Sequence, residues 1–182
     1  MRHGATEWSA AGRHTGRTDL PLTPEGEAQA RRLGRRLGGR RFDLVLVSPL
    51  GRARRTCELA GYGEVAEPDA DLAEFDYGDY EGLTTEQIRE ITPGWTLWTG
   101  ACPGGETLAD VAARADRVVD RVRSVASGDV ALFAHGHILR ILTARWCGLE
   151  PTEGRCFSLD PATRSVLGWE HEYPSVRTWN ET

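Results

Sequence analysis

The chain has 182 residues, the length of one domain that can bury a hydrophobic core without stabilisation by disulfide bonds or metal ions. Its formal net charge of −5 argues against a general nucleic-acid binder, because such proteins normally carry an excess of positive charge. All 22 basic residues are arginine, so chemistry that needs a lysine nucleophile or a lysine Schiff base is excluded.

The cysteines are widely spaced and form no C-x-x-C pair, which argues against a zinc site or a redox motif. They are Cys57, Cys102, Cys147 and Cys156. We expect reduced thiols in a cytoplasmic protein, although the sequence also allows disulfides. No apolar run approaches the length that spans a membrane, so we expect no membrane partner.

Two short apolar runs predict buried strands. Residues 44–47 (Leu-Val-Leu-Val) are stopped by Ser48-Pro49, and residues 130–134 (Val-Ala-Leu-Phe-Ala) follow Gly128-Asp129. Continuous apolar runs of this length are typical of strands that are covered on both faces, as in a parallel sheet.

Helical signals lie around these runs. Thr23 is a suitable N-cap for a helix that begins at Pro24 and ends at Gly38-Gly39. A longer helix is expected from about Thr107 to Ala126, because apolar residues recur there on one stripe. Alternating strands and helices predict a single α/β domain over residues 1–182, a three-layer α/β/α sandwich with a mostly parallel central sheet.

Four motifs suit an anion that is held against a nucleophile. They are Arg2-His3-Gly4, Ser48-Pro49-Leu50-Gly51-Arg52, Glu74-Phe75-Asp76-Tyr77-Gly78 and His135-Gly136. Ligand sites in open α/β sheets lie beyond the carboxyl ends of the strands, where we place both histidines.

A phosphomonoester dianion resists attack until its charge is neutralised and its leaving oxygen is protonated. The neutral imidazole of His3 is the candidate nucleophile, which would take the phosphoryl group as a phosphohistidine. Glu74 is the candidate general acid for the leaving oxygen and the general base for the water that follows.

The remaining motif residues would bind the phosphoryl oxygens. Arg2 and Arg52 offer the paired donors of planar guanidinium groups. His135 would add a third donor, and Gly136 would let the phosphate approach the backbone.

In this order the motifs resemble the histidine phosphatase superfamily, the group that includes cofactor-dependent phosphoglycerate mutase. The resemblance runs from the first residue to at least Leu149. It implies a phosphoglycerate mutase-like fold. It also implies contacts with phosphate or the rest of the substrate from Ser9, Thr15, Gly16 and Tyr77, although mutases generally have asparagine in place of Ser9.

The resemblance further implies that a buried strand leads directly into the Arg2-His3-Gly4 loop. Because no residue precedes Met1 in the sequence, we expect that the first strand is missing from the recorded chain.

The sequence favours a phosphatase over a mutase. Residues 6–9, 77–82 and 133–137 look most like the branch with sedoheptulose-1,7-bisphosphatase and bacterial acid phosphatases, and little room remains between Gly82 and Gly105 for the mutase's substrate-binding insertion. We expect a metal-independent phosphomonoesterase, without a cofactor, for sugar phosphates or phosphoglycerate-type acids. The alternatives are a phosphoglycerate mutase, a phosphoprotein phosphatase and a non-catalytic sugar-phosphate-binding module. The last is disfavoured because His3 and Glu74 are both present.

Recognition of the rest of the substrate stays open at this stage. Arg13, Arg17 and Arg140 could each contact a second phosphate or a carboxylate, and nothing in the sequence ranks them. His137 lacks partners at metal-ligand spacing and is interpreted as structural. Trp95 and Trp98 are expected in the core, with a lid over the substrate as the alternative. An edge-to-edge homodimer would be unsurprising.

Overall fold

A computed structural model describes residues 1–125 and 128–182, and its centre is a short parallel sheet. The strands are β1 (Leu44–Val47), β2 (Ala66–Pro68) and β3 (Val130–Phe133), in the order β2-β1-β3. The two apolar runs therefore form neighbouring strands, with Leu44 opposite Val130.

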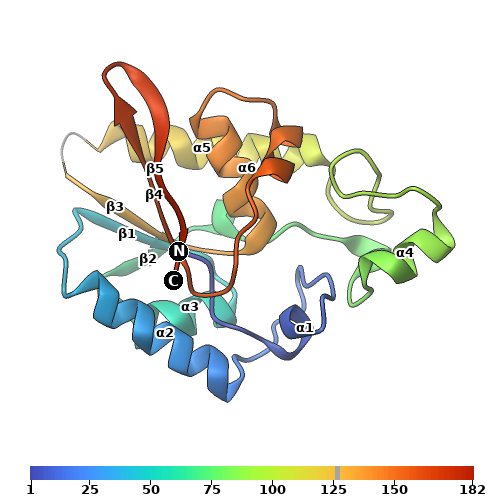
Figure 1. Cartoon of the computed structure of the whole chain (residues 1–182), viewed down its shortest axis with the longest axis horizontal. Coiled ribbons are helices and arrows are strands. Elements are labelled where there is room, and N and C mark those ends of the chain that lie inside the picture. The colour runs from blue at the N-terminus through green and yellow to red at the C-terminus, as the bar shows by residue number, and fades with distance from the viewer. Residues whose placement is uncertain (126–127) are drawn as a thin grey trace.

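Helices cover both faces of the sheet (Figure 1). One face carries α2 (Pro24–Leu37) and α3 (Gly51–Leu59), and the other carries α5 (Leu108–Ser124) and α6 (Gly136–Trp146).

The side chains of β1 show why three layers form. Val45 and Val47 pack in one hydrophobic cluster with α2 and α3, whereas Leu46 packs in a second cluster with α5 and α6. Successive side chains of a strand point to opposite faces, so a continuous apolar run needs cover on both. The predicted three-layer fold is confirmed.

Both predicted helices are present, and they differ from the prediction only at the end of α5. The side chain of Thr23 accepts the N–H of Gly26 at 3.0 Å, and α2 ends before Gly38 in the left-handed region at φ 60°. The helix α5 begins after Thr107 as predicted but ends at Ser124, since Val125 is already extended. The expected end at Ala126 lies outside the described residues.

The other elements connect or extend this core. The strands β4 (Arg164–Glu170) and β5 (Tyr173–Glu181) form an antiparallel hairpin that reaches away from the parallel sheet (Figure 1). The short helices are α1 (Glu7–Ala10) and α4 (Thr85–Ile91), with 3-10 turns at Ala70–Leu72, Gly78–Tyr80 and Pro151–Cys156.

The first residues lie along the end of β3. The N–H of Ala134 donates to the Met1 oxygen at 3.0 Å, and the N–H of His3 donates to the Ala134 oxygen at 3.0 Å. The amino group of Met1 is buried and donates to the Leu132 oxygen at 2.7 Å. Beside it lies a cavity of about 640 Å³, whose lining includes Trp146. The expected preceding strand stays a prediction.

Candidate active site

A small cavity of about 170 Å³ opens beside the N-terminus of α6. The predicted site residues that line it are Arg2, His3, Ser9, Thr15, Glu74, Tyr77 and Gly136. Three other predicted residues, Gly16, Arg52 and His135, are buried and are not among its lining residues.

The imidazole of His3 is buried with a defined tautomer. Its Nδ1 lies 2.7 Å from the carbonyl oxygen of Gly4, which can only accept, so Nδ1 carries the proton and Nε2 keeps its lone pair. Burial lowers the pKa of His3 well below its usual value, and the cations of Arg2 and Arg52 lower it further. The side chain is therefore neutral at pH 7, as a nitrogen nucleophile must be.

The loop after His3 rests directly on the start of α2. A Cβ atom on Gly4 would lie 2.3 Å from the Gly26 oxygen, and one on Gly26 would lie 2.1 Å from the Ala5 oxygen. The N–H of Gly4 donates to the Thr56 hydroxyl at 3.0 Å. Both positions therefore require glycine, and this contact fixes the backbone beside the imidazole.

The guanidinium of Arg2 lies on the cavity wall near Gly136. It donates to the Leu159 carbonyl, while its buried Nε has no partner among the described residues. A Cβ on Gly136 would be 3.6 Å from that Nε and 3.5 Å from a carboxylate oxygen of Glu74. A buried donor without a partner is costly, so this nitrogen is well suited to an anion in the cavity.

The carboxylate of Glu74 is held by three backbone N–H groups. Phe75 donates at 2.9 Å, and His137 and Ile138 each donate at 3.0 Å. The last two belong to the first turn of α6, where N–H groups lack partners within the helix and attract negative charge. This fixes the acid at the cavity wall.

The guanidinium of Arg52 holds a loop. It donates to the carbonyl oxygens of Thr15, Gly16 and Thr18 at 2.8 to 3.0 Å. In this structure most of its donors are thus engaged by the protein. A direct bond from Arg52 to the phosphoryl group stays a prediction.

Both ring nitrogens of His135 are also engaged. Arg52 Nε donates to its Nδ1 at 3.2 Å, so Nε2 carries the proton and donates to the Ser48 hydroxyl at 2.6 Å. Burial lowers the pKa of His135 well below its usual value, with Arg52 as the next contributor. Its expected bond to the phosphoryl group stays a prediction as well.

The predicted substrate contacts have structural partners too. Ser9 forms a capping box with Thr6 at the start of α1, accepting the Thr6 N–H at 2.9 Å. The Tyr77 hydroxyl lies 2.6 Å from His137 Nδ1. The Thr15 hydroxyl donates to the Arg13 oxygen, and a Cβ on Gly16 would be 2.5 Å from the Phe75 oxygen.

The cavity is also lined by Gly12, Arg13, His14, His137, Arg140 and Leu159. Of these, Arg13 and Arg140 were candidates for contact with a second anion, and His137 was interpreted as structural. The ring of His14 packs on Tyr77 and on Trp95, which is buried as expected for a core residue. Trp98 packs against His137 and Arg140. His14 was not predicted to line the site, although it directly precedes the predicted Thr15.

Residues 1–125 and 128–182 contain no group of three or more His, Cys, Asp or Glu side chains that could hold a metal ion. Within the same ranges, no helix has the length and apolar character needed to cross a membrane.

Comparison with known proteins finds phosphatases among the relatives of this chain. The acid phosphatase of Mycobacterium tuberculosis is 45% identical over 174 residues, covering 94% of this chain and 85% of that protein. The sedoheptulose 1,7-bisphosphatase of Saccharomyces cerevisiae is 36% identical over 185 residues, covering 82% of this chain and 66% of that protein. A solved structure of an open reading frame product from Mycobacterium tuberculosis has a TM-score of 0.95 at 43% identity, covering 100% and 95% of the two chains.

A family model described as histidine phosphatase superfamily (branch 1) matches residues 1–182, the span that contains the buried histidines, arginines and glutamate described above. This chain, with phosphatases among its relatives, is a member of the histidine phosphatase superfamily.

Proposed function

We propose that the protein is a metal-independent phosphomonoesterase that hydrolyses small phosphorylated metabolites through a phosphohistidine on His3. The observation that carries this proposal is the state of His3, which is buried and neutral and has an Nε2 lone pair at the cavity. The cavity of about 170 Å³ suits a compact compound.

The first step transfers the phosphoryl group. Nε2 of His3 attacks phosphorus while the bond to the leaving oxygen breaks, and a protonated Glu74 gives its proton to that oxygen. The buried guanidinium of Arg2 stabilises the charge on the equatorial oxygens.

The second step returns the enzyme to its starting state. Glu74, now a carboxylate, takes a proton from water as the water oxygen attacks phosphorus. The bond from phosphorus to Nε2 breaks and phosphate is released, so Glu74 ends protonated and His3 ends neutral. No step needs a metal ion, because arginine donors supply the positive charge.

The test is phosphate release from a panel of phosphomonoesters in the presence of a chelator. The panel holds 3-phosphoglycerate, sugar mono- and bisphosphates and an aryl phosphate, and His3→Ala is measured alongside. We expect release by the parent protein and loss of turnover in the variant, with Cys57→Ser retaining the parental rate as the control. The Cys57 thiol is buried away from the cavity, and burial raises its pKa to about 12.

Three results would contradict the proposal. Turnover by His3→Ala would contradict the assignment of His3 as the nucleophile. Inactivation by a chelator would contradict a metal-independent mechanism. Interconversion of 2- and 3-phosphoglycerate with added bisphosphoglycerate, without phosphate release, would indicate a mutase. The cytoplasmic location and the homodimer stay predictions.

A further inference from the structure

The loop that carries Glu74 is held by an arginine of α5. Arg114 lies on the same face of this helix as Arg117 and Arg121, and all three side chains reach residues 67–76. Arg117 and Arg121 are exposed and pair with carboxylates of that segment. The side chain of Arg114 is only 13% exposed, so it is the member of this face that lies under the loop.

Each N–H donor of the Arg114 guanidinium has a partner in the protein. One terminal nitrogen donates to the carbonyl oxygens of Asp71 at 2.7 Å and Ala73 at 3.0 Å. The Nε and the other terminal nitrogen donate to the two carboxylate oxygens of Glu106 at 2.8 and 2.9 Å. That second nitrogen also makes a longer contact of 3.5 Å with the Glu74 carbonyl oxygen. A guanidinium has five N–H donors, so Arg114 keeps none for a ligand.

Glu106 extends these contacts to the other side of Glu74. Its Oε2 accepts the N–H of Asp76 at 3.0 Å, and its own N–H donates to the Asp76 oxygen at 2.9 Å. The two segments approach closely here, because a Cβ atom on Gly105 would lie 2.3 Å from the same oxygen. Glu106 directly precedes Thr107, the N-cap of α5. The backbone on both sides of Glu74 is therefore bound to the first turns of this helix.

The carboxylate of Glu74 is thus positioned from two helices. The N–H groups of His137 and Ile138 on α6 hold the carboxylate oxygens, and Arg114 and Glu106 hold the main chain from which the carboxylate extends. Neither Arg114 nor Glu106 lines the cavity. An acid must lie about 2.6–3.2 Å from the oxygen that it protonates, and a displacement of about 1 Å can cost about 100-fold in rate.

We propose that Arg114 and Glu106 are positioning residues for the general acid. By fixing residues 71–76 against α5, they place the carboxyl group of Glu74 at the leaving oxygen. This inference rests on the proposed function, because it assigns the acid step to Glu74. Since both residues lie outside the cavity, their loss should slow chiefly the reactions that need an acid.

The test compares a substrate that needs the acid with one that does not. The first is the alkyl phosphate of the panel above that the parent protein hydrolyses fastest, and the second is nitrophenyl phosphate. We expect Arg114→Gln to lower kcat/KM for the alkyl phosphate about 10- to 100-fold, and to change that for nitrophenyl phosphate less than about three-fold. Arg114→Lys should recover part of the loss, because it keeps the charge with donors on a single nitrogen.

A second variant covers the case in which Arg114→Gln does not fold. Glu106→Gln keeps the size of the side chain but replaces one acceptor oxygen by an NH₂ group, which then faces a donor of Arg114 or Asp76. We expect the same selective loss, by about 3- to 30-fold. The matched control is Arg117→Gln, one turn along the same helix, whose bonds are to the side chain of Asp71. It should keep the parental ratio of the two kcat/KM values.

A double-mutant cycle tests whether Arg114 acts through Glu74. In the Glu74→Gln background, adding Arg114→Gln should change kcat/KM for the alkyl phosphate less than about two-fold, because the acid is already absent. An equal loss in both backgrounds would overturn the inference. Equal losses on the alkyl and aryl substrates would also overturn it, as would an effect of Arg117→Gln as large as that of Arg114→Gln.

The result for Glu74 itself separates this inference from the proposed function. If Glu74→Gln leaves the ratio of alkyl to aryl kcat/KM unchanged, another group is the acid and the proposed function fails at that step. If Glu74→Gln changes the ratio and neither Arg114→Gln nor Glu106→Gln does, the role of Glu74 stands and the positioning role of the two residues is rejected.

Discussion

At the scale of single residues, the environment of Glu74 constrains what can replace it. Three N–H groups converge on the two carboxylate oxygens. A glutamine offers one acceptor oxygen and one NH₂ group, so at least one of these donors would face another donor. The position therefore selects a carboxyl group for structure as well as for chemistry.

We expect Glu74→Gln to lower kcat/KM for alkyl phosphates about 100- to 10,000-fold, because the variant cannot protonate the leaving oxygen. The kcat/KM for nitrophenyl phosphate reports the first step and should fall much less, because its leaving group needs no acid, whereas loss of the general base slows the second step for both substrates. The variant should also unfold about 1–3 kcal/mol more easily, owing to the unpaired donor. Phosphate release on both substrates and urea unfolding measure these effects.

The control is Glu58→Gln, an exposed carboxylate on α3 whose partner is Arg55. An equal loss of kcat/KM on alkyl and aryl substrates in Glu74→Gln would contradict the role of general acid.

The sequence identified which residue types gather at the site better than it identified their partners. Arg2, His3 and Glu74 lie in short motifs whose own residue types indicate their chemistry, and all three line the cavity. The bonds of Arg52 and His135 depend on a loop and a strand far away in the chain. No local pattern encodes them.

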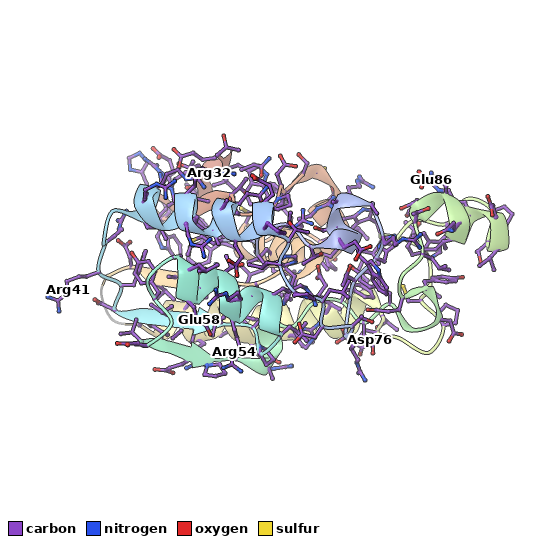
Figure 2. All side chains as sticks on the ribbon, turned by 90° about the horizontal axis from the view of Figure 1, so that it is seen from below. Arg32, Arg41, Arg54, Glu58, Asp76 and Glu86 are labelled. Carbon is purple, nitrogen blue, oxygen red and sulfur yellow. The ribbon has the colours of Figure 1, made fainter. Side chains whose placement is uncertain are left out.

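At the scale of elements, two arginines on α3 lie in different environments. Arg52 points inward and is 1% exposed, while Arg54, two residues later, lies on the exposed face of the helix in Figure 2. Residues two apart on a helix point in nearly opposite directions, so the contrast follows from helix geometry.

Arg52→Gln should lower the free energy of unfolding by about 3 kcal/mol or more, because it leaves three carbonyls, of which that of Gly16 is buried, without their charged donor. It should also raise KM, since the loop it holds supplies Thr15 to the cavity. Urea unfolding and phosphatase kinetics test both points. Arg54→Gln is the matched control on the same helix, and equal stability of the two variants would refute the prediction.

Elements with strong local signals were predictable. The caps at Thr23 and Thr107 set the start of α2 and α5, and the apolar run set β1. By contrast, β2 contains Ala66, Glu67 and Pro68 and carries no strand pattern; it exists because it pairs with β1. The order of the strands likewise depends on pairing across long stretches of chain.

At the scale of the whole molecule, burial of basic groups couples stability to pH. Burial lowers the pKa values of His3, His135 and His137 well below 6.5. The unfolded chain therefore binds protons that the folded chain does not. This preference for the neutral form costs nothing well above pH 6.5 and lowers the free energy of unfolding progressively as the pH falls below 6.5.

We expect the free energy of unfolding to fall from pH 8 to pH 5. The slope approaches about 1.4 kcal/mol per pH unit for each group once the pH is below its unfolded pKa. Urea unfolding at fixed ionic strength measures it. His137→Gln should reduce the slope below pH 6.5, whereas His171→Gln, at a position that is 81% exposed, should not. Equal stability at pH 8 and pH 5 would contradict this account.

The absence of lysine has one more consequence. No side chain of this sequence offers a primary amine, so succinimidyl esters have no lysine to modify. The thiol of Cys156 is exposed, whereas the thiols of Cys57 and Cys102 are buried. A maleimide probe therefore attaches first at Cys156, and slower modification of the two buried thiols reports local opening of the core.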